Sequence, residues 1–335
     1  MAAEMAEQPS VFAHLLHRRN SDIAAICALQ PIRPVGVVFI ARGSSLNACT
    51  YAAYAVEILA QIPVSLARPS VTNRYGARPD YRNWLAIAVS QSGRTPEIIL
   101  AAQAALDCGA RLITITNDPS SPLAQLGVLH LTTHAGEERA VPATKTVTAQ
   151  MLLGLTIAQA LAPNFRPDLG GALSKLPSSA AELLSDHLPP RELAAKWSTF
   201  DALSVVSRGM GFAAAHEVAL KVREVAGIFG EAWSVTAFRH GPIAGVHSGV
   251  AVLNIAMHPH DDEDTAQSLS ELVARGVSIA SCTPNPSADL PLPNAHEFIV
   301  PFYAVLRGQQ LALELALARN RNPDSPEGLN KVTLT

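Results

Sequence analysis

The sequence has little charge, few aromatic residues and few cysteines. Of its 335 residues, 16% are charged and 5% are aromatic, and the formal net charge is -3. Because Lys and Arg are spread along the chain without a basic patch, we expect neither a nucleic-acid partner nor a membrane partner. The 4 cysteines lie far apart and form no CxxC pair, which argues against a zinc knuckle and against a disulfide framework.

Targeting and membrane segments are also lacking. The N-terminal stretch MAAEMAEQPS carries two Glu and has neither a basic start nor an apolar core, unlike a secretory signal. No uninterrupted apolar stretch reaches the roughly 20 residues that a membrane helix needs. We therefore expect a soluble protein in the reducing cytoplasm.

Apolar strands alternate with helical patterns along the whole chain. The strands are expected at residues 36–41, 85–89, 111–116, 128–133, 202–207, 249–257, 276–281 and 297–301. The longer helices are expected from about residue 96, at 143–161, from about 213, at 264–275 and at 304–319. This alternation predicts an α/β fold with two similar parallel-sheet units, each a three-layer αβα arrangement. We place an N-terminal helical segment at 1–35, a first domain at 36–165 and a second domain with a C-terminal tail at 192–335.

An internal repeat supports the two units. RGSSLNACTYAAYAV at 42–56 and RGMGFAAAHEVALKV at 208–222 share Arg, Gly, Ala, Ala and Val at a constant offset of 166 residues. The first copy has Ser44 and Ser45 where the second has Met210 and Gly211. One turn is polar and the other apolar, so we expect the two halves to perform different tasks.

Two loops of the first half are rich in hydroxyl groups. GSS at 43–45 and SQSGRT at 90–95 each follow a predicted strand and precede a helix, a position where backbone N–H groups and hydroxyls suit a phosphate. Helix capping explains the hydroxyls of GSS equally well, whereas five donor side chains in six residues favour an anion site at SQSGRT. Neither loop is a P-loop or a GxGxxG fingerprint, so a small phosphorylated metabolite fits better than a nucleotide cofactor.

The second half contributes titratable groups. Glu217, Lys221 and Glu224 are spaced i, i+4 and i+7 and share one helical face. The alternative is a solvated stripe of ordinary ion pairs. His240 precedes Gly-Pro, and Lys331 stands near the C-terminus, where a frayed tail is the usual expectation. HPHDDED at 258–264 consists of turn and N-cap formers, so we expect no metal site there.

Five motifs in order carry a family resemblance: SQSGRT, VPATKT at 141–146, EVALKVRE, RHGPIA and LNKVT. From about residue 36 to its end the chain resembles the tandem sugar-isomerase (SIS) domains of the isomerase half of glutamine-fructose-6-phosphate amidotransferase. It also resembles the SIS-type glucosamine-6-phosphate deaminases. The resemblance implies phosphate-binding positions at Ser45, Ser90, Gln91, Ser92 and Thr95, with Ser44 beside them.

Further roles are implied in the same way. Val141 and Ala143 match residues that contact the sugar chain, and we expect Lys221 to contact it too. Glu224 matches the carboxylate that moves a proton between C1 and C2. His240 matches the ring-opening histidine, which the family supplies from a neighbouring subunit, so a homodimer with shared sites is expected. Lys331 matches a lysine that can form a Schiff base with the keto sugar.

The expected reaction follows from these roles. The amidotransferase begins with a glutaminase that this chain has no room for, so we expect glucosamine 6-phosphate and water to give fructose 6-phosphate and ammonia, without metal or organic cofactor. Arg94, Ala143 and Arg223 differ from common family residues and bear on the choice of sugar. Galactosamine 6-phosphate and a fructosamine 6-phosphate are alternative substrates. A non-catalytic sugar-phosphate-binding regulator is the alternative from a different class.

Overall fold

The computed structural model describes residues 1–30, 32–164, 167–258 and 263–331, which form two compact units. The first-sheet unit comprises Ser10–Glu138, Lys145–Pro167 and the tail from Asn330. The second-sheet unit comprises Met1–Pro9, Arg139–Thr144 and Asp168–Leu329. The short segment Arg139–Thr144 therefore belongs with the second sheet although it lies within the first half of the sequence.

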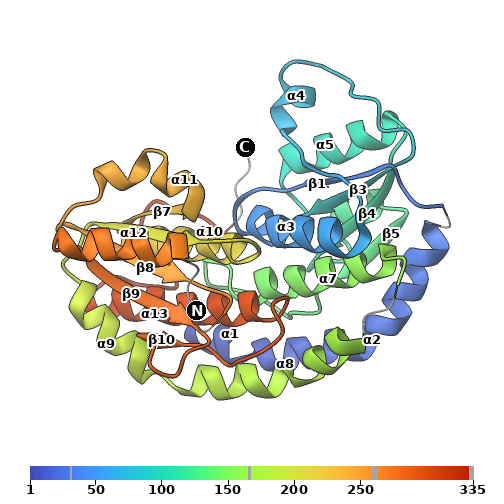
Figure 1. Cartoon of the computed structure of the whole chain (residues 1–335). Helices are drawn as coiled ribbons and strands as arrows, with labels where there is room; N and C mark the ends of the chain where they lie inside the picture. The colour runs from blue at the N-terminus through green and yellow to red at the C-terminus, as the bar shows by residue number, and fades with distance from the viewer. Residues whose placement is uncertain (31, 165–166, 259–262, 332–335) are drawn as a thin grey trace. The chain divides into compact units, whose positions relative to one another are not determined.

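Each unit contains a five-stranded parallel sheet (Figure 1). The first has the order β2-β1-β3-β4-β5, with β1 at Gly36–Ile40, β2 at Val64–Leu66, β3 at Trp84–Val89, β4 at Arg111–Thr116 and β5 at Leu129–Thr132. The second has the order β10-β9-β8-β6-β7, with β6 at Ala202–Ser207, β7 at Phe229–Ser234, β8 at Val250–Ile255, β9 at Ser278–Thr283 and β10 at Leu290–Pro291. Taken in chain order, the two sheets have the same topology.

Helices cover both faces of the first sheet, which explains why its central strands are continuous apolar runs. On one face, Val38, Ile40, Ala86 and Ala88 pack against α5 (Pro96–Asp107). On the other lie α3 (Gly43–Ala55) and α7 (Lys145–Leu161), which contact each other (Figure 1). The remaining helices of this half are α2 (Gln8–Leu29), α4 (Pro69–Asn73), α6 (Pro122–Leu126) and a π-helical turn, η1 (Val56–Ala60).

The second sheet is covered in a similar way. Val206 and Val252 pack against α11 (Val235–Arg239) and α12 (Glu263–Ala274). The helix α10 (Gly211–Lys221) contacts β6, β7 and the long buried helix α13 (Val300–Ala318). The other helices are α1 (Ala2–Ala6), α8 (Pro167–Ser185), α9 (Leu188–Trp197), the π-helical turn η2 (Val222–Ala226) and the 3-10 turn η3 (Pro242–Gly245).

The predicted α/β class with two similar parallel-sheet units is confirmed, and one predicted strand is wrong. Residues 297–301 were expected to form a strand, but α13 already begins at Val300. A short buried apolar run has the same pattern in a strand and in a buried helix, and Pro301 is well placed in a first helical turn. The fifth strand is the two-residue β10 instead. Among the described residues, no helix has the length and apolar character needed to cross a membrane.

Candidate active site

The predicted polar loops lie at the point where the strand order of the first sheet reverses. From β1 the chain moves to β2 on one side and then returns to β3 on the other. In open parallel sheets, ligands bind beyond the carboxyl ends of the strands at such a switch point. The loop 90–95 follows β3 directly, whereas residues 43–45, which were expected to form a loop, are the first turn of α3, just after β1 and the residues 41 and 42. The topology thus brings together two loops that are far apart in sequence.

The loop 90–95 is folded by its own side chains. The backbone N–H of Gly93 donates to Ser90 Oγ at 3.2 Å, and that of Arg94 donates to Ser92 Oγ at 3.2 Å. Both hydroxyls act as acceptors here, so their protons remain able to donate to a ligand. Gly93 has φ +63°, and a Cβ atom there would lie 2.1 Å from Ser121 Oγ. This tight turn therefore requires glycine.

Helix capping does not account for the hydroxyls of Ser45 and Thr95. Thr95 is the N-cap residue of α5, yet its side chain makes no capping hydrogen bond, and Arg42 at the N-cap of α3 makes none either. Within the described residues, the hydroxyls of Ser45 and Thr95 and the side-chain amide of Gln91 form no hydrogen bond. Ser44 does have an interaction partner. Three polar side chains at the switch point are thus available to a ligand.

Ion pairs fix the surroundings of the two loops. Arg42, just after β1, donates to both carboxylate oxygens of Glu97 in the first turn of α5, at 2.8 and 2.9 Å. This two-pronged bond raises the pKa of Arg42 and connects the two loop regions. Arg94 donates to Asp118 Oδ2 at 2.8 Å. Hydrogen bonds from Ser120 and then from Arg94 lower the pKa of Asp118.

Lys331 is anchored rather than frayed. Its Nζ donates to Glu138 Oε2 at 2.8 Å, and the Glu138 side chain is 0% exposed. Residues 332–335, which include the end of the LNKVT motif, lie outside the described residues. Glu138 was missed by the sequence reasoning because no short-range pattern links it to Lys331.

The second-sheet unit contains a buried charged triad, defined as Glu217, Lys221 and Glu224. Lys221 and Glu217 are each 1% exposed, with Nζ 3.6 Å from Glu217 Oε1. Lys221 also donates to Glu224 Oε2, and Glu224 is 24% exposed. The solvated-stripe alternative is therefore wrong for Glu217 and Lys221. Glu224 lies in the π-helical turn η2, a distortion found frequently at functional sites.

Three other predicted site residues lie in the same unit without joining the triad. His240 is exposed at the end of α11, and no hydrogen bond of its ring occurs among the described residues. Val141 donates its backbone N–H to Asp324 O at 2.9 Å, and Ala143 is partly buried two residues further on. In the part of the chain that the structure describes, no hydrogen bond connects the ring of His240 to the triad.

The fold and these loops can be compared with known proteins. A family model described as "SIS domain" matches residues 36–160. A solved structure from Silicibacter pomeroyi, described as a phosphosugar isomerase, is 31% identical to this chain. The similarity covers 97% of this chain and 99% of that one, with a TM-score of 0.85. The chain belongs to the SIS-domain family.

Other similar proteins differ from this chain in length or in sequence. Glutamine–fructose-6-phosphate aminotransferases (isomerizing) of Gloeobacter violaceus and Symbiobacterium thermophilum are 33% and 30% identical. Each match covers 99% of this chain and 58% of the relative, so the chain spans little more than half the length of these proteins. Glucosamine-6-phosphate deaminase of Thermotoga maritima is 23% identical with a TM-score of 0.77, which shows the shared fold alone.

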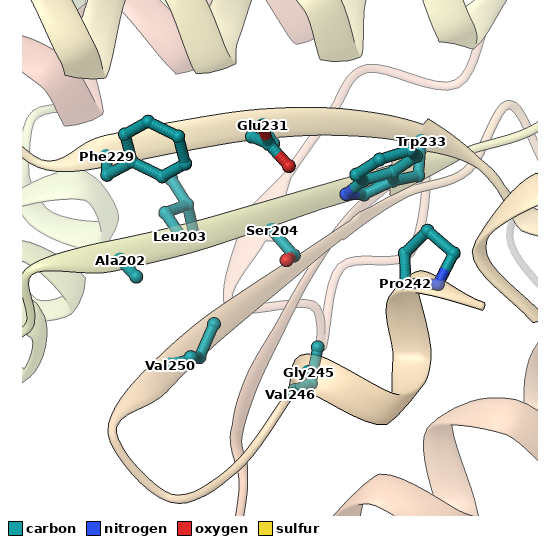
Figure 2. A pocket seen from close by; sticks show the side chains of 10 residues that line it. All are labelled: Ala202, Leu203, Ser204, Phe229, Glu231, Trp233, Pro242, Gly245, Val246 and Val250. Carbon is teal, nitrogen blue, oxygen red and sulfur yellow. The ribbon is translucent and has the colours of Figure 1, made fainter.

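A separate hollow of about 250 Å³ lies beside β6, β7 and the turn η3 in the second-sheet unit of this SIS-domain chain (Figure 2). Figure 2 shows Phe229, Glu231 and Trp233 in a row along β7, with Ser204 on the neighbouring strand. None of the predicted site residues lines this hollow. No cluster of three or more metal-ligating side chains occurs among the described residues, and residues 259–262 of HPHDDED lie outside them.

Proposed function

We propose that this chain is an amino-sugar-phosphate isomerase and deaminase that converts glucosamine 6-phosphate and water into fructose 6-phosphate and ammonia. The observation that carries the proposal is the buried triad. Lys221 is held between two carboxylates in a chain poor in charge, and only Glu224 keeps partial exposure. Removing charged groups from water can cost more than their pairing returns, so this arrangement favours a chemical role over a purely structural one.

In this proposal the switch-point loops bind the phosphate of the substrate. The side-chain donors of Ser45, Gln91 and Thr95 form no hydrogen bond among the described residues, and Ser44, Ser90 and Ser92 lie beside them. Binding the phosphate, which does not react, provides energy that positions the reacting carbons. Val141, Ala143 and Lys221 are proposed to contact the sugar.

Glu224 is proposed to transfer the proton. His240 exchanges protons with the ring oxygen and the C1 hydroxyl, which opens the ring. Glu224 then takes the proton from C2 of the open aldehyde and returns it to C1, which leaves an imine at C2. Water adds to the imine carbon and ammonia leaves, giving the ketone. Lys331 is proposed to bind the open chain, or to form a transient Schiff base with the ketone by loss of water.

A homodimer is the proposed assembly, in which His240 of one subunit serves the site of the other. The exposure of His240 and the absence of a hydrogen bond of its ring among the described residues are compatible with that role. Mixing inactive His240→Ala chains with inactive Glu224→Gln chains should restore part of the activity. A verified mixed dimer without any recovery would exclude action in trans.

The direct test is the simultaneous measurement of ammonia and ketose phosphate after incubation with glucosamine 6-phosphate. Equal amounts of both products are expected. Galactosamine 6-phosphate and a fructosamine 6-phosphate serve as parallel substrates, since the phosphate loops do not read the sugar stereochemistry. A chain that binds these sugar phosphates in calorimetry but releases no ammonia from any of them would be a regulator, and the proposal would be wrong.

A further inference from the structure

The carboxylate of Glu138 occupies a defined position at the N-terminus of α7. Its Oε1 accepts the backbone N–H of Thr146 at 3.1 Å, and its Oε2 accepts the Thr146 hydroxyl at 2.8 Å. A negative charge at a helix N-terminus is stabilised by the helix dipole, and α7 is 17 residues long. The position of this carboxylate is therefore set by the helix, independently of Lys331.

The segment that leads to Glu138 is fixed as well. Asn117, just after β4, accepts the Thr133 hydroxyl at 2.6 Å and the backbone N–H of Ala135 at 3.2 Å through Oδ1. Its Nδ2 donates to the carbonyl of Gly136 at 2.6 Å. The backbone N–H of Asn117 donates to the carbonyl of Gln91 at 3.0 Å. One asparagine thus connects the loop 90–95 with the segment before Glu138.

The ion pair to Lys331 differs from an ordinary surface pair. Exposed pairs contribute little, because fixing two long side chains costs entropy and water screens the charges. Here one partner is fully buried and already fixed by α7, and the Lys331 side chain is 23% exposed. Only the lysine side chain has to be ordered, so the contact is suited to holding the tail in place.

We propose that Glu138 is a positioning residue that holds the ε-amino group of Lys331 at the carboxyl edge of the first sheet, in the same polar framework as the loop 90–95. The anchoring is independent of any chemistry. Its consequence, that the amine is preplaced for the open-chain sugar, rests on the proposed function. Glu138 acts through Lys331 and is not assigned a reacting role.

Anchoring is tested without substrate by tryptic cleavage after Lys331, followed by intact mass spectrometry. In Glu138→Gln, cleavage after Lys331 should be about tenfold faster than in the unmodified protein, which corresponds to about 1.4 kcal/mol. Cleavage after Arg82, whose side chain is 79% exposed, is the internal standard. Glu57→Gln in the same unit is the matched control and should leave the rate unchanged. Lys331→Arg keeps a cation and should stay protected.

Positioning is tested with fructose 6-phosphate and borohydride. A ketone and the lysine amine lose water to form an imine, and borohydride delivers hydride to its carbon, which leaves a stable secondary amine on Lys331. The adduct should form in the unmodified protein, fall about tenfold in Glu138→Gln and be absent in Lys331→Arg. In kinetics, Glu138→Gln should lower kcat more than it raises KM.

The outcomes separate the two proposals. Faster tail cleavage in Glu138→Gln with no adduct and no ammonia in any variant would support the anchor and overturn the proposed function. Equal cleavage rates in Glu138→Gln and Glu57→Gln would overturn the anchor whatever the activity. If Glu138→Gln does not fold, the anchor is tested with Lys331→Met, which removes the amine instead of the carboxylate. Hydrogen exchange of the peptide that contains residues 330 and 331 should then be faster than in the unmodified protein. Unchanged exchange there would overturn the anchor.

Discussion

The switch points of the two sheets have the same topology but opposite chemistry. Between β1 and β3, the hydroxyls of Ser45 and Thr95 make no hydrogen bond with the described residues. Between β6 and β8, the hydroxyl of Ser207 donates to the carbonyl of Ile255 at 2.7 Å. Gly211 lies so close to Met257 that an added Cβ would be 2.7 Å from its terminal methyl. One switch point is polar and available, and the other is filled by the protein itself.

At the C-terminal ends of α3 and α10 the difference is reversed, and the second copy carries the charged residues. Both α3 and α10 continue into a π-helical turn, and the turns η1 and η2 begin at Val56 and Val222, which are 166 residues apart. Each turn is followed by a residue in the left-handed conformation, Gln61 and Gly227. At the position where the second copy has Glu224, the first has the exposed Ile58. The shared backbone thus presents polar loops in one copy and a charged helix end in the other.

The largest effect is expected where the two helix ends differ. Glu224→Gln removes the proposed base without changing its size, so kcat for ammonia release should fall by about 10²- to 10⁴-fold with little change in KM. The same substitution at Glu57, in the corresponding turn of the first copy, should leave kcat within about twofold. Thermal melting controls for folding. If Glu224→Gln retains its activity, Glu224 is not the base, and the difference between the two helix ends has no role in the reaction.

The next largest effect concerns the turn of the loop 90–95. Gly93→Ala introduces a methyl group 2.1 Å from Ser121 Oγ at φ +63°, so the loop cannot keep its shape. We expect calorimetric affinity for a sugar phosphate to fall by more than about tenfold, because a disturbed donor set loses at least one charge-assisted bond of roughly 1.5–3 kcal/mol.

Gly209→Ala provides the matched control for that loop. Gly209 also has a positive φ, +59°, but nothing lies within 4 Å of an added Cβ. It follows β6 in the second copy, so its replacement should cost only about 1–2 kcal/mol of backbone strain. Sugar-phosphate affinity should not change. Equal losses of affinity in both variants would mean that the second switch point also binds the ligand.

A smaller effect is expected from removing one hydroxyl at each switch point, Ser45 at the first and Ser207 at the second. Ser45→Ala should weaken sugar-phosphate binding by about 5- to 20-fold and leave the melting temperature nearly unchanged, because the hydroxyl bonds nothing among the described residues. Ser207→Ala should do the reverse, since its hydroxyl is buried and bonded to Ile255 O. Calorimetry and melting of both variants give the comparison. If Ser207→Ala weakened sugar-phosphate binding and Ser45→Ala lowered the melting temperature, the second switch point would be the binding site instead of the first.

The central strands and the hydroxyl-rich loop 90–95 could be predicted from sequence because their signals are local. A buried strand leaves an uninterrupted apolar run, and five donors in six residues after β3 contrast sharply with that run. The internal repeat predicted α3 and α10 as equivalent helices and showed that the turn before one is polar and the turn before the other apolar. The strand β7 was missed, since Gly230, Glu231 and Ser234 interrupt the strand pattern.

Interactions between distant residues could not be predicted in this way. The spacing of Glu217, Lys221 and Glu224 is compatible with a solvated face, and their burial depends on α10 packing against α13, which begins about 80 residues later. Glu138 and Lys331 are separated by 193 residues. Asn117 follows β4 as an ordinary turn residue would. Only the folded chain shows that it connects the loop 90–95 with the segment before Glu138.

The smallest expected effect compares one histidine of each unit. Burial lowers the pKa of His130 in β5, and burial together with Arg223 lowers the pKa of His216 in α10. Since each folded-state pKa lies below the usual value of about 6.5, the unfolded chain binds more protons below that pH. Stability is therefore complete above pH 6.5 and falls as the pH drops through the lowered pKa.

Melting curves at pH 7.5 and 5.5 should show a decrease of a few degrees, a shift typical of a small change in the free energy of unfolding. His130→Gln should reduce this decrease in a transition of the first-sheet unit, and His216→Gln in a transition of the second-sheet unit. If the units unfold together, either substitution affects the single transition. A melting temperature of the unmodified protein that does not respond to pH would contradict this prediction. It would mean that the folded protein does not hold either histidine neutral and that both behave like exposed histidines.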